Sequence, residues 1–241
     1  MHSLLIALQF LTRIPVGLDF KAGDKQLGYS VLYYPLIGLL IGGLLTILAT
    51  LLANSPAMVA AAILLTAWVL LTGALHLDGL ADCADAWVGG FGDRQRSLRI
   101  MKDPASGPIA VTLLMLVLLL KWTALAALIE QNRLVPLLMT PLLGRSAILL
   151  LMLSTPYVSP QGLAEKLLKH LPETAARWVA GLSIAVAAFV LGLLPILFAG
   201  LLLLWIRHTA ISRLGGVTGD VYGAAVELVE TAVLLGAVLY E

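Results

Sequence analysis

Long apolar runs separated by short polar segments make up most of this 241-residue chain. A transmembrane helix needs about 17–25 predominantly apolar residues, and seven of the runs reach that length. They cover about residues 30–53, 56–77, 109–129, 134–153, 177–194, 196–212 and 224–240. The pattern predicts an all-α fold, a polytopic integral membrane helix bundle with about seven transmembrane helices.

One of these boundaries depends on two residues. The stretch from Val179 to Ile206 carries no charged residue and is too long for a single membrane-spanning helix. Gly192 and Pro195 interrupt it, and because such residues break helices we expect a tight helical hairpin there.

The N-terminal apolar segment, residues 1–11, is too short to cross a bilayer. It also lacks the basic start and the small-residue cleavage site of a signal peptide. We expect a short interfacial or re-entrant helix that ends at Arg13-Ile14-Pro15. Only the segments 78–108 and 154–176 leave room for structure outside the membrane, so residues 1–241 are predicted to form a single transmembrane domain.

Composition agrees with the membrane prediction and limits the kind of partner. Hydrophobic residues make up 60% of the chain and charged residues 12%, with a mean hydropathy of +0.99, whereas soluble domains are about half apolar and a quarter charged. The net charge of +1 argues against a nucleic-acid partner.

Lysine and arginine gather on one side of the predicted seven-span arrangement. That side carries Arg13, Lys21, Lys25, Arg94, Arg96, Arg99, Lys102, Lys166, Lys169, Arg177, Arg207 and Arg213. The other side carries Arg133, while Lys121 and Arg145 fall inside spans. Because basic loops face the cytoplasm, we expect the N-terminus inside and the C-terminus outside.

Three carboxylates follow the second apolar run at positions i, i+4 and i+7: Asp78, Asp82 and Asp85. On a helix they form one stripe spread over about 60°. Stacked like charges repel, and a divalent cation such as Mg²⁺ would relieve that repulsion and hold phosphates. The stripe therefore favours a metal-dependent phosphoryl-transfer site, the alternative being a solvated acidic helix end. His76 could orient a carboxylate or act as a base, or could simply be hydrogen-bonded.

A glycine-rich and basic segment comes next, running from Gly89 through Arg96, Arg99 and Lys102 to Asp103. Glycines allow close approach of the backbone to phosphate, and the cations supply counter-charge. The segment is a candidate diphosphate cradle, although a basic loop also serves orientation and lipid headgroups.

Acidic residues recur around the last span. Asp220 follows a Gly-rich turn and is either an N-cap or a site residue. Glu227 and Glu230 lie inside the span, where ionisable groups are costly and mark a site or a buried partner. Lys121 and Arg145 are the available cations, and we assign Glu227 to the site and Glu230 to an ion pair.

The lone cysteine, Cys83, excludes an intramolecular disulfide and is interpreted as a small packing residue. Two further interpretations of the charges differ in class. A secondary transporter would use the intramembrane charges, but the acids gather at one face and no inverted repeat is visible. A non-catalytic scaffold would not need three stacked aspartates.

Several runs occur in an order that resembles a known family. They are Phe10-Leu11-Thr12-Arg13-Ile14-Pro15, Tyr34-Pro35-Leu36-Ile37-Gly38, His76-Leu77-Asp78-Gly79-Leu80-Ala81-Asp82, Ile100-Met101-Lys102-Asp103 and Gly216-Val217-Thr218-Gly219-Asp220 with Glu227. The chain resembles the cobalamin synthase (adenosylcobinamide-GDP ribazoletransferase) family over essentially its whole length. A more distant similarity is to CDP-alcohol phosphotransferases, whose aspartate spacing differs.

The resemblance implies a Mg²⁺-dependent enzyme of the bacterial cytoplasmic (inner) membrane. Its substrates are adenosylcobinamide-GDP and α-ribazole, or α-ribazole 5′-phosphate, and GMP is released. The chain itself leaves the oligomeric state open, including a homo-oligomer.

The resemblance also implies roles for the candidate residues. Asp78, Asp82 and Asp85 would hold Mg²⁺; Arg96, Arg99 and Lys102 would bind phosphates; Asp103 or Asp220 would accept a proton, with His76 and Glu227 as further catalytic candidates. The family usually carries an arginine soon after Lys102-Asp103, where this chain has Pro104-Ala105-Ser106-Gly107. A phosphate contact from Arg99 or Arg96 would replace it.

Overall fold

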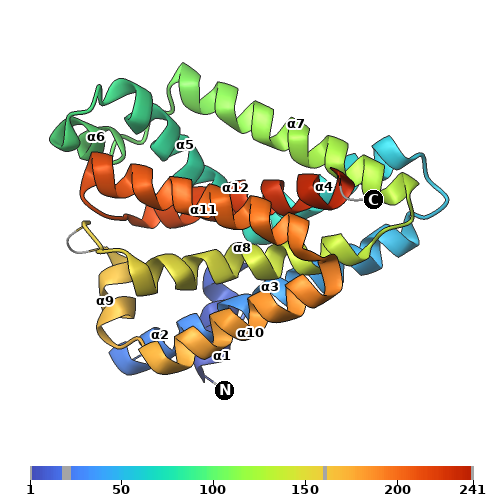
Figure 1. Ribbon diagram of the computed structural model, residues 1–241, viewed down its shortest axis with the longest axis horizontal. Helices are drawn as coiled ribbons and strands as arrows, with labels where there is room; N and C mark the ends of the chain where they lie inside the picture. The colour runs from blue at the N-terminus through green and yellow to red at the C-terminus, as the bar shows by residue number, and fades with distance from the viewer. Residues whose placement is uncertain (1, 18–22, 160–161, 240–241) are drawn as a thin grey trace.

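The computed structural model describes residues 2–17, 23–159 and 162–239, and within them every regular element is helical. This confirms the predicted all-α class, and Figure 1 shows the helices side by side in one bundle. The elements are α1 (His2–Leu11), α2 (Asp24–Ser30), η1 (Val31–Tyr33), α3 (Tyr34–Leu51), α4 (Ala57–Thr72), α5 (Leu75–Gly89), α6 (Arg94–Ile100), α7 (Pro108–Glu130), α8 (Val135–Ser154), α9 (Leu163–Lys169), α10 (Glu173–Leu191), α11 (Leu193–Leu214) and α12 (Gly219–Leu239).

The number of spans agrees with the sequence. In the described part of the chain, six helical stretches are long and apolar enough to cross a membrane. The bent pair α4–α5 makes a seventh if it is counted as one span. The predicted hairpin is also confirmed, since Gly192 separates α10 from α11 with φ +80°, and Pro195 lies in the first turn of α11. The predicted N-terminal helix is α1.

The second predicted span, residues 56–77, is wrong as a single helix. It breaks after α4, where Gly73 and Ala74 both adopt left-handed backbone angles, φ +65° and φ +58°. Helices α4 and α5 consequently meet at 90°. Arg13 supports the break, because its backbone N–H donates to the Leu71 carbonyl at 2.7 Å and its side chain fills the space beside Gly73.

This break changes the position of the acidic stripe. Residues 78–85 lie on α5, and α5 packs against α12 and α7 rather than extending into an extramembrane loop. Cys83 on the same helix is buried and free, as predicted.

Helices α8 and α12 form the centre of the bundle. Their spans are 78% and 83% buried inside the protein, compared with 28% for each of α7, α10 and α11. Close backbone contacts explain how α3 packs against α8. A Cβ on Gly38 or Gly42 of α3 would collide with the backbone of Pro141 or Leu138 in α8. Glycines at this spacing allow membrane helices to pack closely.

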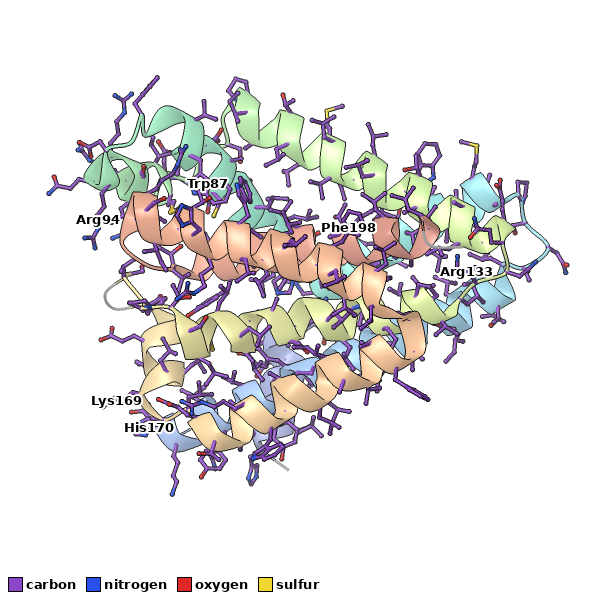
Figure 2. The ribbon with its side chains drawn as sticks, viewed as in Figure 1. Trp87, Arg94, Arg133, Lys169, His170 and Phe198 are labelled. Carbon is purple, nitrogen blue, oxygen red and sulfur yellow. The ribbon has the colours of Figure 1, made fainter. Side chains whose placement is uncertain are left out.

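Predicted basic segments gather at one end of the bundle. Figure 1 shows α6, α9 and the α11–α12 turn at that end, and Figure 2 shows Arg94 and Lys169 there with Arg133 at the opposite end. Lys21, which the same prediction includes, lies outside the described residues. The placement of this end in the cytoplasm stays a prediction.

Candidate active site

A cavity of about 320 Å³ lies between α5, α8 and α12, with α1, α3 and α9 completing its wall. Two carboxylates and a histidine reach it, and so do several aromatic rings. The polar lining includes Asp78, Asp220 and His76. Of the residues singled out in the sequence, these three are therefore brought together by folding.

Two glycines bring α5 and α12 into close contact beside this cavity. A Cβ on Gly79 would lie 2.7 Å from the backbone oxygen of Asp220. A Cβ on Gly223 would lie 3.1 Å from the backbone oxygen of His76. The absence of side chains at these positions lets Asp78 and Asp220 approach the same space from opposite helices.

The turn before α12 is fixed by capping and by a short strap. Thr218 caps the helix, because its hydroxyl oxygen accepts from the Val221 N–H at 3.3 Å; the same hydroxyl donates to the Asp220 carboxylate, also at 3.3 Å. Asp220 is therefore not the N-cap but a first-turn residue. The strap consists of backbone bonds from Val158 to Val217 (2.9 Å) and from Val217 to Pro156 (2.8 Å).

The three aspartates of the stripe have different surroundings. Asp78 is exposed and Asp82 is half-buried, and neither carboxylate makes a hydrogen bond or ion pair with another described residue. Asp85 instead caps α7: its two carboxylate oxygens accept from the backbone N–H groups of Gly107 at 2.5 Å and Ala110 at 3.0 Å.

The predicted three-aspartate metal site is consequently not a ready-made cluster. No group of three or more His, Cys, Asp or Glu side chains in the described ranges is arranged to hold one ion. The carboxylates nevertheless remain close enough to interact, since Asp82 is repelled by Asp220, Asp78 and Asp85. Their assignment to Mg²⁺ stays a prediction.

The predicted phosphate-binding residues lie on or just after α6, away from the cavity lining. Arg96, Arg99 and Lys102 are all exposed, and the Arg96 guanidinium lies 5.0 Å from the centre of the Phe91 ring. Asp93 caps α6 by accepting from the Arg96 N–H at 2.7 Å.

Arg94 lies within the predicted diphosphate cradle but was not among the three residues assigned to phosphate binding. A Cβ on Gly215 would lie 3.3 Å from its guanidinium carbon, so Arg94 contacts the α11–α12 turn that leads to Asp220 (Figure 2). Its position directly after the glycine-rich run was the available signal.

Asp103 lies in the loop after α6 and does not line the cavity. It is exposed, and its carboxylate accepts from the Ala105 N–H at 3.0 Å. Nearby Met101 is buried, and its sulfur lies 3.9 Å from the Thr218 hydroxyl oxygen. This contact holds the loop against the beginning of α12.

Glu227 belongs to a buried ion network rather than to the cavity lining. Lys121 on α7 donates to Glu227 at 2.5 Å and to Glu230 at 2.7 Å, and Arg145 on α8 donates to Glu230. All four side chains are less than 10% exposed. The predicted ion pair of Glu230 is confirmed. Glu227 belongs to the same network, and its assignment to the site stays a prediction.

Aromatic residues are the part of the cavity that the sequence prediction missed. The rings of Tyr157 and Tyr222 stack with centroids 6.3 Å apart, and those of Phe10 and Tyr34 stack at 6.0 Å. Partial burial raises the pKa of the Tyr157 hydroxyl above its ordinary value, so this group stays a donor at neutral pH. Phe10 and Tyr34 fall within recognised runs, but Tyr157 has no local sequence signal.

Two buried polar atoms of this cavity have no hydrogen-bond partner among the described residues. They are Nδ1 of His76 and the hydroxyl of Tyr222, on side chains that are 4% and 5% exposed. Buried polar groups are normally paired, so these two are available to a ligand or to water.

Comparisons with known proteins agree over the full chain. Residues 3–238 match the family described as cobalamin-5-phosphate synthase. An adenosylcobinamide-GDP ribazoletransferase of Pseudomonas fluorescens is 57% identical over 98% of this chain and 98% of its own length. Relatives with the same name in Pseudomonas putida and Pseudomonas aeruginosa are 56% and 53% identical, each over 99% of this chain and over 99% and 98% of their own lengths. No solved structure matches the chain.

Proposed function

The chain belongs to the cobalamin-5-phosphate synthase family, and we propose that it acts as an adenosylcobinamide-GDP ribazoletransferase. It would transfer the adenosylcobinamide-phosphate group of adenosylcobinamide-GDP to α-ribazole or α-ribazole 5′-phosphate and release GMP. The products are adenosylcobalamin or its 5′-phosphate. The full-length relatives carry this name, which supports the substrate pair.

One observation carries the proposal at the level of this chain's own residues. Asp78 of α5 and Asp220 of α12 reach the same cavity, at the end of the bundle where Arg94 lies. Carboxylates for a metal or a proton, beside cations for phosphate, are the groups that phosphoryl transfer requires.

The transfer exchanges one phosphorus–oxygen bond for another. A ribose hydroxyl oxygen of the acceptor bonds to the phosphorus attached to cobinamide, the bond to the bridging oxygen breaks, and GMP leaves with that oxygen. The hydroxyl proton passes to a carboxylate. Asp220 suits this role because it lines the cavity. Asp103, which was the other candidate, lies in the adjoining loop.

The available carboxylates fit Mg²⁺ of the kind used in phosphoryl transfer. Such Mg²⁺ is bound through one or two carboxylates together with waters and substrate phosphates, so three protein ligands are not required. Asp78 and Asp82 have no competing hydrogen bond among the described residues, whereas Asp85 is already the cap of α7. Bound there, Mg²⁺ would neutralise diphosphate charge.

The basic residues of α6 and its flanks would bind the donor's phosphates. Arg96, Arg99 and Lys102 are exposed, and Arg94 contacts the turn that leads to Asp220. This geometry adds Arg94 to the set predicted from the sequence. The enzyme would lie in the bacterial cytoplasmic membrane, with these loops in the cytoplasm, as their excess of lysine and arginine predicts.

The transporter alternative loses its main support. Lys121, Arg145, Glu227 and Glu230 pair with one another, and their formal charges sum to zero. Coupling sites in transporters are typically built from broken helices near the membrane midplane. Here Asp78 and Asp220 line the cavity and take no part in that buried network.

The test is GMP release by the purified protein in detergent. We expect release only when adenosylcobinamide-GDP, ribazole and Mg²⁺ are all present. Asp220→Asn should lower kcat by about 10²–10⁴-fold, the range typical of a lost general base. Glu173→Gln, a change in an exposed surface pair, is the control and should leave the rate unchanged. Failure of the wild-type protein to release GMP would reject the proposed function.

A further inference from the structure

In addition to Asp78 and Asp220, the wall of the cavity contains aromatic side chains. Four aromatic rings contribute to its wall: Phe10, Tyr34, Tyr157 and Tyr222. Within each stacked pair the rings are close to parallel, inclined by 9° for Tyr157 and Tyr222 and by 23° for Phe10 and Tyr34. Flat aromatic walls of this kind suit a flat aromatic ligand.

The size of the cavity limits which part of the two substrates can enter it. At about 320 Å³ it lies near the lower end of the range of roughly 300–1,000 Å³ found for small-molecule sites. A nucleoside is of this size, whereas a corrin ring with its side chains is several times larger. The corrin must therefore remain outside this space.

The wall of the cavity combines two unpartnered polar atoms with apolar side chains. His76 Nδ1 and the Tyr222 hydroxyl are buried, lack partners among the described residues and belong to side chains of the cavity wall. The neighbouring wall residues Ile148 and Met152 offer no hydrogen bonds. A ligand here needs a hydrophobic body with few polar atoms, because each polar group left unpaired on burial opposes binding.

We propose that this cavity binds the acceptor nucleoside, with its base packed against the tyrosine rings and its ribose beside Asp220. The inference rests on the proposed function and adds the location and orientation of one substrate. The base of ribazole is a benzimidazole, which has few hydrogen-bonding atoms. Guanine, the other aromatic base in the reaction, carries an amide and an amine, and the apolar wall side chains Ile148 and Met152 offer these groups no partners.

This position of the nucleoside gives a role to each of the two carboxylates that line the cavity, Asp220 and Asp78. A ribose held beside Asp220 places its hydroxyl near a carboxylate that can take the proton. Asp78 then lies between the acceptor and the exposed surface of α5, where the donor's diphosphate can be held by metal and cations. The large corrin and the guanosine both stay on the open side.

The experiment measures α-ribazole and GMP binding separately, by calorimetry on the full-length protein in detergent without the other substrate. Ile148→Phe adds a ring to the cavity wall and should weaken ribazole binding by about tenfold or more, with the GMP affinity unchanged. Leu150→Phe is the matched control, because Leu150 is on the same helix but lines a different cavity. It should leave both affinities unchanged.

A second variant protects the test against misfolding of the first. Tyr157→Ala removes a half-buried ring from the segment that precedes α9 and should also weaken ribazole binding. Unchanged ribazole affinity in both variants would overturn the proposal. Loss of GMP affinity with intact ribazole affinity would overturn it in favour of the donor's guanosine.

Failure of this inference is distinguishable from failure of the proposed function. If the wild-type protein releases GMP and the KM for ribazole is unchanged in Ile148→Phe, the function stands and the location is wrong. If ribazole binds and both variants weaken it, but no GMP is released, the location stands and the proposed reaction is wrong.

Discussion

Asp82 and Asp85 are three residues apart on α5, and their surroundings give them different roles. The Asp82 carboxylate makes no hydrogen bond with a described residue and is repelled by neighbouring carboxylates. Asp85 satisfies two backbone N–H groups at the beginning of α7, which would otherwise lack partners. One of the two is therefore free for a ligand, and the other ties a helix in place.

This difference predicts opposite effects of the same substitution. Asp82→Asn removes a charge from a repulsive cluster, so the melting temperature should stay the same or rise, while Mg²⁺-dependent activity falls by about 10²-fold or more. Asp85→Asn replaces one acceptor oxygen by an amide donor facing an N–H, so it should cost about 1–2 kcal/mol of stability. Thermal unfolding and GMP release measured on both variants check this. Equal loss of activity with unchanged stability in both would show that Asp85 is a metal ligand.

Sequence reasoning was sufficient for the face of the stripe but not for the partners of its members. Helical periodicity places Asp78, Asp82 and Asp85 on one side of α5, and they are found on that helix. Which of them caps a neighbouring helix depends on Gly107 and Ala110, more than twenty residues along the chain. Spacing cannot reveal that contact. Tyr157 was missed for the same reason, because its position in the cavity wall depends on stacking with Tyr222.

At the scale of elements, buried charges connect α7, α8 and α12. Lys121 bonds two glutamates of α12, and Arg145 bonds the second of them. Each helix thus supplies a charge that is stable only if its partners are present. The network fixes the orientation of α12. It thereby also fixes the position of Asp220, which lies in the first turn of the same helix.

A double-mutant cycle on this network should show strong coupling. Lys121→Met or Glu227→Gln alone leaves a desolvated charge and should cost about 3–5 kcal/mol, whereas the double change should cost less than the sum. The exposed pair Arg177–Glu173, with both side chains 67% exposed, is the control and should show coupling of at most about 0.5 kcal/mol. Unfolding is followed in one detergent. Additive losses for Lys121 and Glu227 would mean that the pair does not stabilise the fold.

The helical elements themselves were largely predictable, and the exception has a physical cause. Apolar runs located the spans, and Gly192 located the hairpin. The break at Gly73 and Ala74 was missed because neither residue forbids a helix, and an apolar run reads as continuous. The break is stabilised by Arg13, a residue that lies far away in the sequence.

For the whole molecule, the sequence predicts which ends of the helices lie together more securely than how they pack. Alternating spans place the basic segments at one end, and Figures 1 and 2 show them there. The cavity could not be predicted, because it is lined by residues of six helices and the segment around Tyr157. Its contents depend on tertiary contacts such as that of Gly79 with Asp220.

The orientation of the bundle gives the last prediction. In a background with Cys83→Ala, cysteine placed at Arg94 or at Asn54 reports opposite ends, since both residues are exposed and Asn54 lies in the α3–α4 connection. The excess of lysine and arginine places the Arg94 end in the cytoplasm. A membrane-impermeant thiol reagent added to intact spheroplasts should therefore label Asn54→Cys at once, and Arg94→Cys only after permeabilisation.

Two results would contradict this orientation in different ways. Labelling of both positions from outside would mean that the bent pair α4–α5 does not cross the membrane, because the two positions then share a side. Labelling of Arg94→Cys alone would invert the bundle and place Asp220 and the α6 cations outside the cell. That outcome would separate the site from the cytoplasmic nucleotides on which the proposed transfer depends.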